Sequence, residues 1–159
     1  MIKRTAPRMR LCVICLLLVL TFIWGNSLLP GVSSGTLSDS VKMLLQKLFP
    51  FLFSGTGDGG GGWLRKLAHF SEFALLSICL CWLFAMLRSR LTEQIPPVLL
   101  CGIIAACIDE TIQRFIPGRN GNLTDVGIDS AGVVTGIVMF TVGYLIVINM
   151  NQHNLEELK

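Results

Sequence analysis

Four long apolar runs constrain the fold of this chain more than any other feature of its sequence. They cover residues 11–29, 67–87, 96–115 and 128–148. Each run is close to the ~20 residues that an α-helix needs to cross a bilayer. Charged residues make up only 14% of the chain, against roughly 25% in an average soluble domain. The sequence therefore predicts a single all-α domain over residues 1–159, an integral membrane four-helix bundle.

The flank of the first run predicts the orientation of the chain. Lys3, Arg4, Arg8 and Arg10 precede this run without an acidic residue, which places the N-terminus in the cytoplasm. Four spans return the C-terminus to the same side. A cleaved signal peptide is the alternative, but the run continues through Trp24, which favours a retained anchor. Six basic residues on the predicted outer side weaken the charge asymmetry: Lys42, Lys47, Arg65, Lys66, Arg114 and Arg119.

The segment between the first two runs, residues 30–66, is predicted to lie outside the cell. Leucine and valine recur in it at helical spacing, which indicates a short extracytoplasmic amphipathic helix on the membrane surface or, alternatively, a cap on the bundle. The apolar positions are Leu37, Val41, Leu44, Leu45, Leu48 and Leu52. A glycine-rich hinge follows at 55–62, and its spacing does not match a nucleotide-binding loop. The net charge of +3 and the few aromatics near basic residues argue against nucleic acid as a partner.

Polar residues form stripes at the ends of three apolar runs. Lys66, His69 and Glu72 are three apart and share one helix face. The other two stripes combine acids with small residues, which allow close helix packing and point the acids into the bundle. They consist of Gly102, Ala105, Ala106, Asp109 and Gln113, with Glu110 beside them, and of Asp125, Asp129, Gly132 and Gly136.

In an up-and-down bundle these three stripes meet at the same end. We therefore expect one polar site at the outer membrane boundary, formed by Lys66, His69, Glu72, Asp109, Glu110, Gln113, Arg114, Arg119, Asp125 and Asp129. One charge at mid-membrane costs at least ~2.5–3.5 kcal/mol, so the charges should be paired. The available pairs are Glu110 with Arg114, His69 with Glu72, and Arg119 with any of the acids.

Three motifs occur in order: KLAHFSEF (66–73), DETIQRFIPGR (109–119) and DVGIDSAGVVTG (125–136). Together they resemble the VanZ-like family, whose pattern is roughly K-x-x-H-F-x-E-Y, D-E-x-x-Q-x-F-x-x-x-R and D-x-x-x-[ND]-x-x-G-x-x-x-G. Phe73 stands where the family often has tyrosine, Asp129 stands where asparagine is common, and WGNSLL in the first run matches only loosely. The resemblance implies a bacterial plasma-membrane protein associated with resistance to the glycopeptide teicoplanin. It also implies, by analogy, kinship with four-helix membrane proteins that process or recognise phosphate-bearing lipid head groups.

The chemistry of the cluster suits a lipid head group or a lipid-linked precursor. Head-group binding is assigned to the cations and to residues that position the group: Lys66, Gln113, Arg114, Arg119 and Asp129. Catalytic candidates are the proton carrier His69 and the acids Glu72, Asp109, Glu110 and Asp125. A divalent cation could be held by Asp109, Glu110, Asp125 and Asp129.

These residues leave three functions open. The first is an enzyme that transfers or hydrolyses a phosphodiester or pyrophosphate of a lipid-linked substrate. The second is a head-group binder that does no chemistry. The third is a structural ion-pair network in a membrane protein that acts through protein contacts.

Overall fold

The computed structural model describes residues 5–48, 62–87 and 90–157. All regular structure in these residues is helical, which confirms the predicted all-α fold. The glycine-rich hinge predicted at 55–62 lies outside the described residues, except that Gly62 begins a helix.

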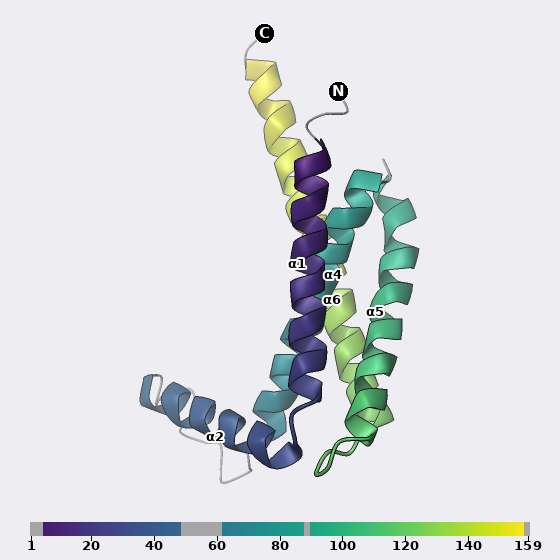
Figure 1. Cartoon of the computed structure of the whole chain (residues 1–159). Coiled ribbons are helices and arrows are strands. Elements are labelled where there is room, and N and C mark those ends of the chain that lie inside the picture. Colours follow the sequence, from purple (N-terminus) through teal and green to yellow (C-terminus); the bar gives the residue numbers. More distant parts are fainter. Residues whose placement is uncertain (1–4, 49–61, 88–89, 158–159) are drawn as a thin grey trace.

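Four helices within the described residues are long and apolar enough to cross a membrane. They are α1 (Thr5–Ser27), α4 (Gly62–Leu87), α5 (Leu91–Arg114) and α6 (Leu123–Glu157). The helices alternate in direction, and both termini lie at the same end of the bundle (Figure 1). The predicted bundle of four membrane-spanning helices is thereby confirmed.

All four spanning helices begin five or six residues earlier than the apolar runs from which they were predicted, and the starts of α5 and α6 show how. Helix α5 begins at Leu91, before the proline pair at 96–97, and Glu93 lies in its first turn. Helix α6 begins after Asn122, whose backbone carbonyl accepts from the backbone N–H of Asp125 at 2.9 Å. The Asn122 side chain also accepts from the Thr124 N–H at 3.3 Å, which makes Asn122 the N-terminal cap of α6. Hydropathy locates the apolar middle of such helices, whereas polar residues extend their first turns beyond it.

Helix α4 lies at the centre of the bundle and packs against α1, α5 and α6, most extensively against α6. Two glycines of α6 allow this close packing. A side chain at Gly132 would overlap the carbonyl oxygen of Phe70, and one at Gly136 would overlap the Ala74 carbonyl oxygen and Ser77 Oγ. The glycine stripe predicted from the sequence therefore packs within the chain, against the backbone of α4.

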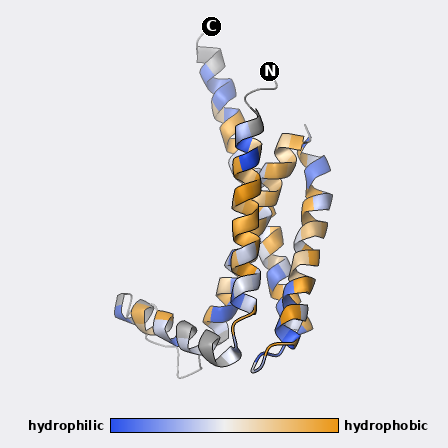
Figure 2. Ribbon diagram, in the orientation of Figure 1, coloured by the Kyte–Doolittle hydropathy of each residue, from blue (hydrophilic) through white to orange (hydrophobic). Residues whose placement is uncertain are grey.

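The interior of the bundle is small, and much of its outer surface is apolar. Phe73, Leu76 and Val133 are buried in the core, whereas Leu18 and Val138 are more than half exposed. Figure 2 shows hydrophobic residues along the outer faces of the helices and hydrophilic residues toward their ends. Such a surface suits contact with lipid chains.

Helix α2 (Gly31–Leu48) confirms the predicted helix between the first and second spans. It projects sideways from the end of the bundle opposite the termini (Figure 1). Val41, Met43 and Leu44 are exposed on it, as in a helix that lies along a membrane surface. This position favours the surface helix over the cap on the bundle.

The start of α2 is attached to the loop between α5 and α6. The Gly31 N–H donates to the carbonyl oxygen of Pro117 at 3.1 Å. A side chain at Gly31 would overlap the carbonyl of Gly118, which itself has a φ of 74°. Glycine is therefore suited to both positions, at 31 for space and at 118 for backbone conformation.

Candidate functional site

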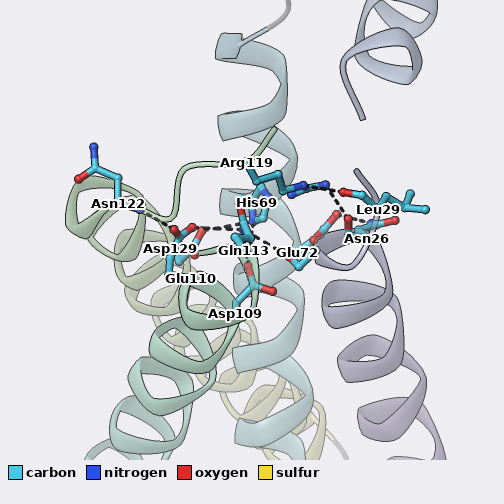
Figure 3. Close-up of polar contacts among 11 residues, drawn as sticks. Asn26, Leu29, His69, Glu72, Asp109, Glu110, Gln113, Arg119, Asn122 and Asp129 are labelled. Carbon is cyan, nitrogen blue, oxygen red and sulfur yellow. Dashed lines mark hydrogen bonds and ion pairs between the residues drawn. The ribbon is translucent and has the colours of Figure 1, made fainter. Parts of the chain in front are cut away.

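The predicted site residues occupy the end of the bundle remote from the termini. They come from the start of α4, the end of α5, the loop at 115–122 and the start of α6 (Figure 3). The end of α1 completes the site with Asn26 and Ser27, of which Ser27 is fully buried. The polar stripes of three helices therefore converge as their spacing indicates.

The centre of the site is formed by one residue from each of three helices. His69 Nδ1 of α4 lies 3.6 Å from Asp109 Oδ2 of α5 and 3.8 Å from Asp129 Oδ1 of α6. Both aspartates are fully buried. Asp109 Oδ1 and both Asp129 carboxylate oxygens have no hydrogen-bond partner among the described residues. The sequence predicted a pair between His69 and Glu72, but the histidine instead faces these two carboxylates.

Gln113 holds the centre together from the end of α5. Its side-chain amide donates to Asp109 Oδ2 at 2.8 Å, to Glu110 Oε1 at 3.3 Å and to Ser27 Oγ of α1 at 3.3 Å. The side chain is almost completely buried. Gln113 therefore fixes the orientation of two acids and connects α5 to α1.

Replacing Gln113 by leucine should destabilise the protein while preserving side-chain size. Buried acceptors that lose their donor cost about 1–3 kcal/mol, so we expect a clear fall in the melting temperature in detergent. Gln152→Leu, at an exposed position of α6, is the matched control and should melt like the wild type. Equal melting temperatures for all three proteins would contradict this role.

Glu110 is bound by the loop and not by Arg114. Its Oε2 accepts from the backbone N–H of Asn122 at 2.8 Å, just before α6 begins. Arg114 is exposed, so the predicted pair of Glu110 with Arg114 is wrong. The reason is that the loop returns a backbone donor to Glu110, which sequence spacing does not reveal.

Glu72 pairs with a neutral residue of α1. The Asn26 side-chain amide donates to Glu72 Oε1 at 3.1 Å, while Oε2 is buried without a partner in the described part of the chain. The predicted partner, His69, has its Nδ1 nearest to Asp109 and Asp129 instead. Asn26 thus joins α1 to the polar face of α4.

Arg119 binds the end of α1 and not the acids expected from the sequence. Its Nε donates to the carbonyl oxygen of Leu29 at 2.9 Å, and its Nη2 donates to that of Asn26 at 2.6 Å. Burial, followed by the nearby charge of Arg65, lowers the pKa of this guanidinium, and the neighbouring acids raise it. The cation satisfies carbonyl groups that the end of a helix leaves open, and only Nη1 is left without a partner in the described residues.

Two cavities adjoin the centre. The smaller has a volume of about 10 Å³ and is lined by Arg65, Lys66, His69, Asp125 and Asp129, among others. This volume is close to the roughly 10–15 Å³ that one water molecule needs. Lys66 is exposed and Asp125 half-buried at its edge.

The larger cavity has a volume of about 300 Å³ and lies among α1, α2 and α4. Arg65, His69, Glu72 and Arg119 form its polar side. Its apolar side is formed by Phe22, Leu29, Val41 and Leu64. Arg65 and His69 line both cavities, so the two adjoin at these residues.

Sequence reasoning did not assign Arg65, Asn26 or Ser27 to the site. Arg65 lies four residues before His69, so helical spacing could have placed both on one face. Asn26 and Ser27 belong to the WGNSLL segment of the first run. They carry no charge, so they did not stand out in a search for buried charges.

Comparison with known proteins supports the resemblance to the VanZ-like family. A family model described as VanZ/LLP1 matches residues 12–147, which is most of the chain. The chain is 33% identical over 61 residues to the "Uncharacterized protein C11E3.10" of Schizosaccharomyces pombe. That match covers 38% of this chain and 36% of the yeast protein, so the chain corresponds to about a third of that relative. No solved structure matches. The three polar motifs, the four-helix bundle and the family match agree, and the chain belongs to the VanZ/LLP1 family.

Proposed function

We propose that this VanZ/LLP1 family member binds the phosphate-bearing head group of a membrane lipid or a lipid-linked precursor. The larger cavity carries this proposal, because it has a cationic side and an apolar side at the same end of the bundle. The cationic side is lined by Arg65 and Arg119, with His69 and one acid, Glu72. The apolar side is lined by Phe22 and Leu29. An amphiphile with a phosphate head has the complementary distribution of polar and apolar groups.

The polar side suits a phosphate. Arg65 is half-buried and lines both cavities, while Arg119 has one nitrogen, Nη1, without a partner among the described residues. Arginine binds phosphate oxygens through parallel N–H donors, and burial strengthens these bonds. Lys66, exposed at the edge of the smaller cavity, adds a further positive charge.

The apolar side continues into the membrane-spanning part of the bundle. Phe22 and Glu72 also line a third cavity of about 540 Å³, with Leu18 and Leu75, between α1 and α4. Leu18 and Phe22 lie within the membrane-spanning helix α1 and are well exposed. A lipid in the bilayer can therefore bring its head group to Arg65 while its chain runs between α1 and α4.

A binding assay with matched lipids tests this proposal. The purified full-length protein in lipid nanodiscs should retain phosphatidic acid over diacylglycerol with the same chains. Arg65→Ala should weaken phosphatidic acid binding at least tenfold, since a hydrogen bond to a charged group contributes about 1.5–3 kcal/mol. Arg90→Ala, an exposed arginine at the other end of the bundle, is the control and should leave binding unchanged. Equal retention of both lipids, or no effect of Arg65→Ala, would reject the proposal.

Hydrolysis or transfer at a lipid phosphoester or pyrophosphate is the second candidate function. It is favoured by Asp109 and Asp129, which are fully buried beside His69, and Asp129 also lines the smaller cavity. A site that only binds an anion does not require two buried carboxylates. A site that moves a proton or activates a nucleophile does need such groups.

Turnover of head groups distinguishes the two functions. Phosphate or head-group release from a panel of lipid phosphates and lipid pyrophosphates should fall at least 100-fold in His69→Ala, as loss of an acid–base group predicts. In the same variant phosphatidic acid binding should fall less than in Arg65→Ala, because both arginines of the larger cavity remain. Absence of turnover above this variant for the whole panel would reject the enzyme and leave the binder.

The proposed surroundings of the site are the outer face of a bacterial plasma membrane, with both termini in the cytoplasm. Four basic residues before the first apolar run, and the absence of acids there, support this orientation. A role in teicoplanin resistance rests on the family alone. Bacteria that produce the protein should tolerate more teicoplanin than bacteria that produce Arg65→Ala, and equal sensitivity would reject that role.

A further inference from the structure

We propose that His69, Asp109 and Asp129 form a binding site for one divalent transition-metal cation, of which Zn²⁺ and Mn²⁺ are the first candidates. The site adjoins the proposed head-group cavity at His69, but the proposal of a metal does not depend on lipid binding. One ligand atom from each residue lies within 4.8 Å of the other two.

The spacing of these atoms suits a small cation. His69 Nδ1 lies 3.6 Å from Asp109 Oδ2 and 3.8 Å from Asp129 Oδ1. At metal–ligand distances of about 2.0–2.2 Å, neighbouring ligand atoms in tetrahedral or octahedral sites are about 2.8–3.6 Å apart. Small rotations of the side chains therefore bring the three groups into coordination.

The burial of these groups requires a compensating charge. Asp109 and Asp129 are fully buried, and both oxygens of Asp129 lack a hydrogen-bond partner among the described residues. The same holds for Asp109 Oδ1 and His69 Nδ1. Buried carboxylates are strongly unfavourable unless they are paired or coordinate a metal. A divalent cation at this point offsets the charge of both carboxylates and gives a partner to His69 Nδ1 and Asp129 Oδ1.

The neighbouring contacts explain why these three residues, and not others, form the set. Gln113 donates to Asp109 Oδ2 at 2.8 Å and so fixes the orientation of that carboxylate, as outer-shell groups do around metal ligands. Glu110 is occupied by the Asn122 N–H and by Gln113. Asp125 lies at the half-buried edge of the smaller cavity. The acids predicted as metal ligands from sequence are thereby reduced to Asp109 and Asp129, and His69 is added.

The ligand types indicate the class of metal. One imidazole nitrogen and two carboxylates suit Zn²⁺, Mn²⁺ or Fe²⁺ better than Ca²⁺ or Mg²⁺, which prefer oxygen alone. Three protein ligands leave at least one coordination position open. The smaller cavity, with room for about one water molecule, adjoins His69 and Asp129, so a water or a phosphate oxygen can occupy that position.

Metal content measured on the full chain tests this proposal. The protein is purified in detergent, loaded separately with Zn²⁺, Mn²⁺ and Ca²⁺, desalted and analysed by elemental mass spectrometry. We expect about one equivalent of Zn²⁺ or Mn²⁺ and no retained Ca²⁺. Asp129→Asn and His69→Gln should each lower the affinity for the retained metal at least tenfold. Asp125→Asn, a matched change at the edge of the same cavity, should retain the metal as the wild type does.

Thermal unfolding provides a second readout. A chelator should lower the melting temperature of the metal-loaded wild type and of Asp125→Asn, but not that of Asp129→Asn or His69→Gln. Two results would overturn the proposal. In the first, the wild type retains no more metal than Asp129→Asn and His69→Gln do. In the second, Asp125→Asn loses as much metal as those two variants. If Asp129→Asn does not fold, His69→Gln alone decides the outcome. The metal is measured without added lipid. A protein that retains no metal can therefore still bind phosphatidic acid, and a protein that does not bind phosphatidic acid can still retain the metal.

Discussion

Gly136→Leu should prevent α4 and α6 from packing, whereas Gly143→Leu in the same helix should be tolerated. A side chain at Gly136 meets the backbone of Ala74 and the Ser77 hydroxyl, while the space around Gly143 is open to at least 4 Å. Backbone atoms cannot move aside as a flexible side chain can. We expect a loss of about 3 kcal/mol or more at Gly136, at the upper end of the range for overpacked cores.

The corresponding alanine variants sharpen this comparison. Alanine stabilises an open helix position by up to about 1 kcal/mol relative to glycine, so Gly143→Ala should be neutral or more stable. Gly136→Ala should be less stable despite the same gain in helix propensity. Unfolding in mixed micelles, followed by circular dichroism, measures both pairs. Equal stability of the variants at 136 and 143 would show that the two helices do not approach closely at Gly136.

Arg119→Ala should loosen the end of α1 and with it the wall of the larger cavity. The guanidinium donates to two carbonyl oxygens, those of Asn26 and Leu29, and is only 6% exposed. Each charge-assisted hydrogen bond contributes about 1.5–3 kcal/mol, so we expect a large fall in stability. Amide hydrogen exchange should increase at residues 26–31, where the backbone loses this support.

Arg114→Ala is the matched control for this change, because Arg114 is exposed near the same end of the bundle. It should leave both stability and exchange close to those of the wild type. Arg119→Lys should recover only part of the loss, since one ammonium cannot reproduce the planar arrangement of the guanidinium donors. Similar exchange in Arg119→Ala and Arg114→Ala would contradict the role of Arg119 as a support for α1.

The sequence predicts where the polar residues gather but not which groups they contact. Helical spacing places His69, Asp109 and Asp129 on inward faces, and the alternation of spans brings those faces to one end. These inferences need only helix geometry and the number of spans. The meeting of these three side chains at one end of the bundle can therefore be predicted from the helical spacing and the number of spans in a single sequence.

The contacts of Arg119 and Glu110 could not be predicted in the same way. Both bind backbone groups, at the end of α1 and at Asn122, whose positions depend on the path of the loop at 115–122. Sequence patterns show charges but not backbone donors and acceptors made available by a turn. Asn26 was missed for a related reason, because a neutral amide in an apolar run resembles many others.

The length of α6 has a further consequence for experiments on the intact membrane. Its 35 residues, at ~1.5 Å each, extend about 52 Å, well beyond the roughly 30 Å of a hydrocarbon core. Asp125 and Asp129 place its first turns at the polar end, so the excess length emerges on the other side, where its exposed residues include Asn151 and Gln152. A membrane-impermeant maleimide that reacts with the thiol introduced by Gln152→Cys therefore reports the compartment opposite the site. One such measurement on cells would decide in which leaflet the lipid that reaches Arg65 resides.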